Sequence, residues 1–136
     1  MAVNNPSAER IAEILHNSKR IAVVGASSKP ERASHAVAKY LLERGYEILP
    51  VNPGESEILG QKSYKSLSEI EGKVDIVDVF RRSEATDPII DEALAIGAPV
   101  IWLQEGVVNE AGAERAEAKG VTVLQDICIK KERAKL

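Results

Sequence analysis

Short apolar runs rich in valine and isoleucine recur along this chain and limit its fold more than any other feature. They read IAVV at 21–24, YEILPV at 46–51, VDIVDVF at 74–80, APVIWL at 98–103 and VTVL at 121–124. Nearly continuous apolar runs of this length are typical of strands buried on both faces of a parallel sheet. We therefore expect each run to form one strand of such a sheet.

Helical patterns lie between most of these runs. We expect helices at about 33–44, 88–96 and 110–119, and an earlier helix that carries Ile11, Ile14 and Leu15 on one face. Asp87 is the expected N-cap of the helix at 88–96. Strands that alternate with helices require right-handed crossovers. The pattern therefore predicts an α/β fold, a Rossmann-like three-layer structure with a doubly wound parallel sheet of about five strands, in a single domain over residues 1–136.

The pattern weakens between Asn52 and Val74. We interpret this part as a loop, a short extended piece and a helix of one or two turns. Ser66 and Glu69 have the spacing of a capping box at the start of that helix.

Charge and cysteine content argue against several classes of site. The net charge of −3 argues against a nucleic-acid or membrane-surface partner, because such partners favour basic domains. The single cysteine, Cys128, can form no internal disulfide and belongs to no zinc-binding set, so we expect no metal site. The polar start, MAVNNPSAER, does not resemble a signal peptide, and no apolar run approaches the about 20 residues of a membrane helix. We expect a cytoplasmic protein whose oligomeric state is unknown.

In a doubly wound sheet, ligands bind at the carboxyl ends of the strands near the point where the strand order reverses. The first loop at this edge contains Gly25, Ala26, Ser27, Ser28 and Lys29. Gly25 permits a tight turn, and the next helix directs its free N–H groups and its positive dipole end toward it. The second glycine of the dinucleotide fingerprint is replaced by Ser27, which adds a hydroxyl, and Lys29 adds a cation. We predict a phosphate-binding turn; the alternative is an ordinary strand–turn–helix connection.

The second strand ends at Asn52, where NAD-binding folds usually place an acid for the ribose 2′-hydroxyl. The nearest acid, Glu55, comes after a Pro-Gly turn. A neutral residue suits a ribose that carries an extra phosphate better than it suits NAD. Asn52 and Pro53 could also form a plain turn without a ligand.

Two arginines, Arg81 and Arg82, follow the third predicted strand on the ligand side of the sheet. An arginine there can form a charge-assisted pair with a phosphate. We favour Arg81 because it is the first residue beyond the strand. The alternative is a solvated loop, or an ion pair with Glu84 or Asp87.

The following loop begins with Gln104, Glu105 and Gly106, which could line the same crevice. Glu105 could act as a general base, but no partner for it is identifiable, so we assign no catalytic residue. The remaining polar or unusual side chains are expected to have structural roles. We expect a packed thiol at Cys128, a core position for Trp102, surface or rim positions for His16 and His35, and solvent-facing carboxylates on opposite strand faces at Asp75 and Asp78.

Five segments occur in the order and spacing of a known family: VGASSKPERAS, PVNP, ILGQKSY, VDIVDVFR and IWLQEGVVN. The chain resembles the small stand-alone CoA-binding-domain proteins, which are similar to the N-terminal CoA-binding domain of the succinyl-CoA synthetase α subunit. The resemblance runs from about residue 11 to the terminal DICIKKERAKL.

The resemblance implies a Rossmann-like fold and coenzyme A as the ligand, and it implies no reaction. In that family the turn after the first strand holds the phosphates, and the end of the second strand flanks the adenosine. The matching positions here are Gly25, Ser27, Ser28 and Lys29 for the phosphates, and Val51, Asn52 and Pro53 for the adenosine. Arg81 matches the family's position after the VDVF-like strand, and Gln104 to Gly106 match its later loop. The synthetase's phosphorylated histidine belongs to a second domain, and neither His16 nor His35 occupies a matching place.

Three functions are consistent with these residues. We favour a binding or regulatory module for coenzyme A or an acyl-CoA without its own catalysis. The second possibility is an NAD(P)- or acyl-CoA-dependent enzyme of the same fold, which the missing ribose acid and the lack of a nucleophile–base pair weaken. The third is a regulatory or structural subunit with a vestigial ligand site.

Overall fold

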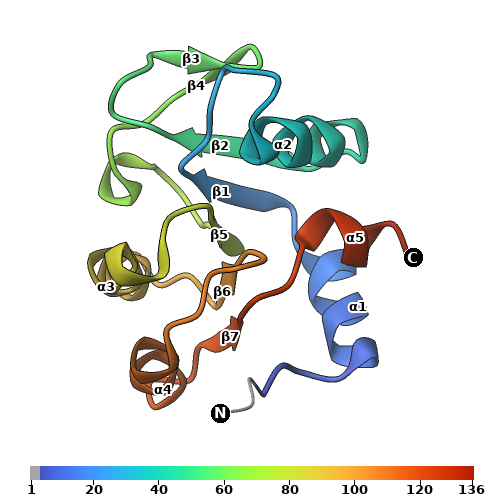
Figure 1. Ribbon diagram of the computed structural model, residues 1–136, viewed down its shortest axis with the longest axis vertical. Coiled ribbons are helices and arrows are strands. Elements are labelled where there is room, and N and C mark those ends of the chain that lie inside the picture. Colours follow the sequence, from blue (N-terminus) through green and yellow to red (C-terminus); the bar gives the residue numbers. More distant parts are fainter. Residues whose placement is uncertain (1–3) are drawn as a thin grey trace.

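The structure, a computed structural model, describes residues 4–136 and has a five-stranded parallel sheet at its centre (Figure 1). The strands are β1 (Arg20–Val24), β2 (Glu47–Val51), β5 (Ile76–Val79), β6 (Val100–Leu103) and β7 (Thr122–Leu124). They pair in the order β2-β1-β5-β6-β7, with every pair parallel. The strand order therefore reverses between β1 and β5. The predicted doubly wound sheet of about five strands is confirmed.

Helices cover both faces of the sheet (Figure 1). One face carries α1 (Ala8–Asn17), α2 (Ala33–Glu43) and α5 (Ile129–Arg133), and the other carries α3 (Asp87–Ala95) and α4 (Glu110–Glu117). Each face has its own apolar core. Trp102 and Leu41 belong to the first core, and Ile101 and Ile90 belong to the second. Every strand residue from Ile76 to Val79 and from Val100 to Leu103 is buried, as a sheet covered on both faces requires.

Local sequence explains where α1 and α4 begin. Ser7 caps α1 by accepting a hydrogen bond from the Arg10 amide at 3.2 Å, and Asn109 caps α4 through the Gly112 amide at 2.8 Å. A Cβ at Gly112 would lie 2.6 Å from Cδ1 of Ile90. The glycine inside α4 therefore lets this helix pack closely against α3.

Three local expectations were wrong or incomplete. Thr86, not Asp87, is the N-cap of α3, and Asp87 is its first residue. The segment between β2 and β5 forms the antiparallel hairpin β3 (Glu57–Ile58) and β4 (Gln61–Lys62), followed by the 3₁₀-helix η1 (Leu67–Glu69). The Ser66 side chain accepts no cap hydrogen bond there, while the Glu69 carboxylate accepts from the Lys65 amide at 3.0 Å.

The chain beyond β7 also adds an element that the periodicity did not predict. It returns to the first face of the sheet and forms α5 beside α1 and α2 (Figure 1). None of the helices in residues 4–136 is long and apolar enough to cross a membrane.

Candidate functional site

A pocket of about 590 Å³ opens at the carboxyl ends of β1, β5 and β6, beside the point where the strand order reverses. This is within the size range of small-molecule sites, about 300–1,000 Å³. Most of its lining comes from three segments, each of which follows a strand: Gly25, Ala26, Ser27, Lys29, Arg32, Ala33 and Ser34; Phe80, Arg81 and Arg82; and Gln104, Glu105, Gly106 and Val107. Asn52 and Glu55 contribute from the end of β2.

The structure brings together most of the residues that the sequence predicted for a ligand site. Gly25, Ala26, Ser27, Lys29, Asn52, Arg81, Gln104 and Glu105 line the pocket. Ser28 does not line it, and Pro53 lies in an adjoining hollow of about 540 Å³ that also contains Lys62 and Lys65. Glu55 lines both spaces and so stands between them.

The turn after β1 depends on glycine. Gly25 has a φ of 88°, and a Cβ at this position would overlap the carbonyl oxygen of Phe80 at the end of β5. The Gly25 amide donates to the carbonyl of Val51 at 3.1 Å. The turn is therefore held against both neighbouring strands.

Residues 25–32 form the loop between β1 and α2, and α2 begins at Ala33, where the sequence predicted the helix to start. Within the loop, the Lys29 amide donates to the Ser27 hydroxyl at 3.0 Å, and Nδ1 of His35 lies 2.9 Å from the Ser27 carbonyl. No side chain accepts a cap hydrogen bond at the start of α2. Ala33 and Ser34, its first two residues, line the pocket, so the positive end of the helix faces this space.

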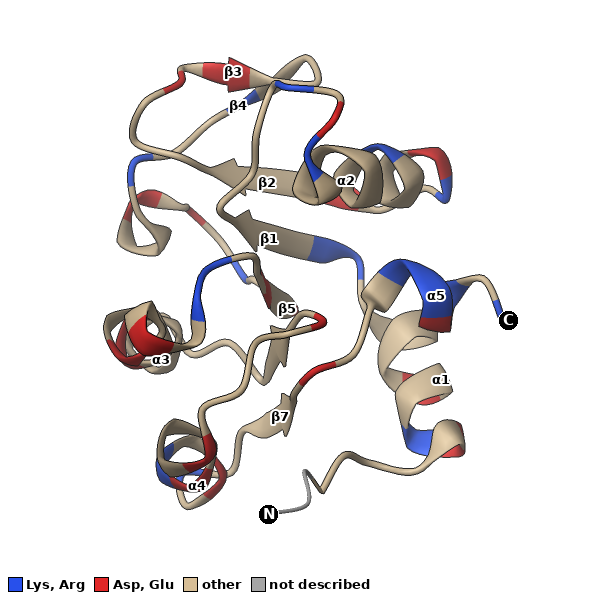
Figure 2. Cartoon of the chain, in the orientation of Figure 1, with Lys and Arg blue, Asp and Glu red and all other residues tan. Residues whose placement is uncertain are grey.

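Four cationic side chains surround the pocket, although the whole chain is acidic. They are Lys29, Arg32, Arg81 and Arg82, and no ion pair joins any of them to a carboxylate of residues 4–136. Figure 2 shows these basic segments in the loop after β5 and in the loop before α2. Of the two carboxylates in the lining, Glu105 is paired with Lys131 at 2.8 Å. The excess of positive charge makes the pocket suitable for an anion.

Sequence reasoning left out Arg32 and ranked Arg82 below Arg81, yet both line the pocket. The alternative that Arg81 or Arg82 pairs with Glu84 or Asp87 is wrong, because no such ion pair occurs among residues 4–136. Asp87 pairs with Arg115 instead, at 3.5 Å. Arg32 lies just before the predicted helix start, and its charge beside the glycine turn was the available signal.

Asn52 braces the turn. Its side-chain nitrogen donates to the carbonyl of Ala26 at 2.8 Å, and its side-chain oxygen accepts from the Gly54 amide at 2.8 Å. Gln104 has a similar structural contact, since its buried side chain accepts from the Ile129 amide at 3.1 Å and so positions the start of α5. Both residues reach the pocket wall while their amide groups hold protein backbone.

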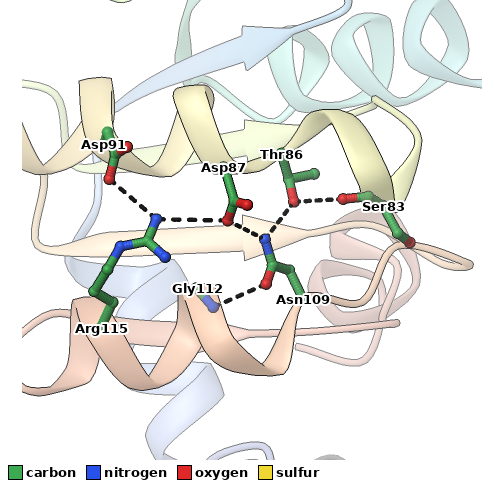
Figure 3. Close-up of polar contacts among 7 residues, drawn as sticks. All are labelled: Ser83, Thr86, Asp87, Asp91, Asn109, Gly112 and Arg115. Carbon is green, nitrogen blue, oxygen red and sulfur yellow. Dashed lines mark hydrogen bonds and ion pairs between the residues drawn. The ribbon is translucent and has the colours of Figure 1, made fainter.

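A polar network fastens the loop after β5 to the loop after β6 (Figure 3). Ser83 accepts from the Val108 amide at 2.9 Å through its hydroxyl, and the Thr86 hydroxyl donates to the Ser83 carbonyl at 2.7 Å. Asn109 donates to the Thr86 hydroxyl at 2.9 Å and to Asp87 at 2.8 Å. The loop after β5 that carries Arg81 and Arg82, here called the arginine loop, is therefore held in a fixed position relative to residues 104–107 of the pocket wall.

Arg115 extends the same network along the two helices. Its guanidinium lies 3.5 Å from Asp87 and 3.0 Å from Asp91, so α4 is paired with α3 (Figure 3). These ion pairs are exposed, and such pairs contribute about 0–1 kcal/mol each. The hydrogen bonds of Asn109 and Ser83 are therefore the main polar link.

Asp78 contradicts the expectation of a solvent-facing carboxylate. It is fully buried in β5, between Val23 and Trp102 in the strand register, and neither carboxylate oxygen has a hydrogen-bond partner among residues 4–136. Burial raises the pKa of this carboxyl well above its usual value. Asp78 does not line the pocket, whereas Asp75 accepts from the amides of Lys19 and Arg20 near the opposite end of the strand.

The other side chains that were considered have no place in the pocket. Cys128 and Trp102 are buried as expected, and His16 is exposed on α1. No group of three or more His, Cys, Asp or Glu side chains in residues 4–136 is placed to hold a metal ion.

A family model and several relatives match this chain. The family model described as CoA binding domain matches residues 19–134. The uncharacterized protein YneT of Bacillus subtilis (strain 168) is 52% identical over 128 residues, which covers 94% of this chain and 95% of that protein. The subunit alpha of the ADP-forming acetate–CoA ligase I of Pyrococcus furiosus is 38% identical over 108 residues, but the match covers 75% of this chain and only 23% of that subunit.

Solved structures have the same fold. A hypothetical protein from Pyrococcus horikoshii OT3 superposes with a TM-score of 0.93 at 38% identity, covering 100% of this chain and 99% of that one. The protein cell-free ID.343 from Thermus thermophilus superposes with a TM-score of 0.92 at 34% identity, covering 96% of this chain and 98% of that one.

Proposed function

The chain belongs to the CoA binding domain family, and we propose that it binds coenzyme A or an acyl-CoA in the pocket between the 25–29 turn and Arg81. In this proposal the protein is a binding or regulatory module without catalysis of its own. The phosphates of the ligand lie against the turn and the start of α2, and the cations of the pocket neutralise them.

The four unpaired cations around one pocket are the observation that carries the proposal. Coenzyme A has a pyrophosphate and a ribose 3′-phosphate, so it needs several positive groups within a short distance. Lys29 and Arg32 flank the turn, and Arg81 and Arg82 stand across the pocket. Arginine pairs well with phosphate because its planar guanidinium can donate two parallel hydrogen bonds.

The end of β2 favours coenzyme A over NAD. Asn52 is neutral and uses its side chain to hold Ala26 and Gly54, so it offers no carboxylate to a ribose 2′-hydroxyl. The name of the Pyrococcus furiosus relative places it in an enzyme that uses CoA. The chain matches only part of that subunit, so we carry over the ligand and not the reaction.

Calorimetric titration with coenzyme A, dephospho-CoA and NAD tests the ligand. We expect coenzyme A to bind at least about tenfold more tightly than dephospho-CoA, because the 3′-phosphate makes a hydrogen bond between charged groups. Equal binding would remove any role for the 3′-phosphate. Tighter binding of NAD would overturn the proposal.

A panel of acyl-CoA thioesters tests the absence of catalysis. We expect the thioester absorbance to stay constant over hours with the protein present. Thioester cleavage that is abolished by Glu105→Gln would instead favour the enzyme hypothesis, since Glu105 is one of the two pocket carboxylates and could act as a base.

A further inference from the structure

Glu55 makes a contact that a phosphate ligand would need for itself. Its Oε2 accepts a hydrogen bond from the Ser28 amide at 3.1 Å. Ser28 lies in the middle of the turn, and its neighbours Ser27 and Lys29 both line the pocket while Ser28 does not. A carboxylate of the protein therefore occupies one backbone amide of the turn that is predicted to bind phosphate.

We infer that Glu55 is a built-in competitor of the ligand, whose ionised carboxylate must leave the Ser28 amide before a phosphoryl group can take its place. This inference rests on the proposed function, because it assumes that an anion binds at the turn. By this inference Glu55 lowers the affinity of the protein for its ligand, whereas the surrounding cations raise it.

Hydrogen bonds from Ser28 and the charge of Lys29 favour the ionised form of the Glu55 carboxylate at the turn. Hydrogen bonds from Ser28 lower the pKa of Glu55 below its usual value, and Lys29 lowers it further. A carboxylate and a phosphoryl group compete for the same donors, since both are anions that accept from backbone N–H groups. Both cannot occupy the Ser28 amide, and like charges side by side repel each other.

The Glu55 carboxylate has few hydrogen bonds at the turn, and a second position is open to it. Apart from Ser28, its nearest side-chain donor is the Asn52 amide at 3.5 Å, at the limit of a hydrogen bond. Glu55 also lines the adjoining hollow that holds Lys62 and Lys65. A displaced carboxylate can therefore turn toward these lysines, so that its release needs a side-chain rotation and no change of the fold.

Titrations of Glu55→Gln test the inference. We expect this variant to bind coenzyme A about tenfold more tightly than the natural protein, because one hydrogen bond to a charged group no longer has to be broken. Glu57→Gln is the matched control, since Glu57 is exposed on β3, lines neither space and carries the same charge. Its affinity should equal that of the natural protein.

Two outcomes of the coenzyme A titration would overturn the inference. If coenzyme A binds equally to the natural protein and to Glu55→Gln, Glu55 does not compete with the ligand. If Glu55→Gln binds more weakly, Glu55 contacts the ligand and the inference is also overturned.

Inorganic pyrophosphate, as a second probe, separates the inference from the proposed function. If coenzyme A binds to neither protein while pyrophosphate binds Glu55→Gln more tightly than the natural protein, the competition by Glu55 is supported and the choice of coenzyme A as the ligand is wrong. If neither probe binds either protein, both proposals fail.

Discussion

The Cα of Gly25 faces the carbonyl oxygen of Phe80 so closely that no Cβ fits between them. The Gly25 amide also donates to the carbonyl of Val51 at 3.1 Å, so the ends of β1, β2 and β5 meet at this one residue. The shape of the pocket floor therefore depends on a position that excludes every side chain.

Gly25→Ala should lower the free energy of unfolding by about 2–4 kcal/mol, because it combines backbone strain at positive φ with a collision in packed surroundings. Gly45→Ala is the matched control: Gly45 has a φ of 95° but nothing within 4 Å of its Cβ position. There we expect a loss of about 1 kcal/mol. Urea unfolding of both variants measures the difference, and equal losses would contradict the crowding at Gly25.

Lys29→Ala should weaken the binding of coenzyme A by roughly five- to a hundredfold, the range for losing a hydrogen bond between charged groups. Arg81→Gln should give a loss in the same range. Lys39→Ala removes the same charge from the exposed face of α2, outside the pocket, and should leave affinity unchanged. Calorimetry measures all three, and the losses should shrink as salt is added. An unchanged affinity in Lys29→Ala would mean that backbone groups hold the phosphates without it.

Two substitutions at Asn109 separate its cap from its contacts with the arginine loop. Asn109→Ala removes both and should cost about 1–3 kcal/mol of stability. Asn109→Asp keeps the cap oxygen for the Gly112 amide, but it loses the donated hydrogen bonds to Thr86 and Asp87 and adds a like charge beside Asp87. We expect Asn109→Asp to bind the ligand more weakly even under conditions where the variant is fully folded, because the arginine loop loses its hydrogen bonds to residue 109. Equal affinity with the natural protein would show that the arginine loop does not need this link.

Asp78 should make stability decrease as the pH rises. Its pKa in the folded protein is raised well above the usual 3.8, so the folded state holds a proton that the unfolded state releases. The stabilisation is complete below the unfolded pKa and is lost as the pH rises to the folded pKa, with a slope of up to about 1.4 kcal/mol per pH unit. Denaturant unfolding across this range should show the slope in the natural protein and a flatter profile in Asp78→Asn. The same slope in both proteins would exclude Asp78 as its source.

Much of the fold follows from the sequence because burial on both faces leaves a strong pattern. The Val- and Ile-rich runs located all five strands of the main sheet, and Gly45 and Gly97 marked helix ends. The topology rule then placed the ligand site at the carboxyl ends of the strands, where the loops after β1 and β5 do meet in a pocket.

The parts that could not be predicted depend on contacts between distant residues. The β3–β4 hairpin has strands too short for any periodicity, and α5 is fixed by packing on α1 and α2 rather than by its own pattern. The pattern predicted helices on both faces of the sheet, but the sequence alone could not show how completely the Asp78 side chain is enclosed. Likewise, only the folded chain brings Glu55 to the Ser28 amide.

The pocket spans the ends of the neighbouring strands β1 and β5, where the strand order reverses. A ligand that contacts the 25–29 turn at one end and Arg81 at the other would link these two strands and oppose their local separation. Amide hydrogens of Val23 and Val79, deep in the sheet, should then exchange more slowly with deuterium when the ligand is bound, although neither residue touches it.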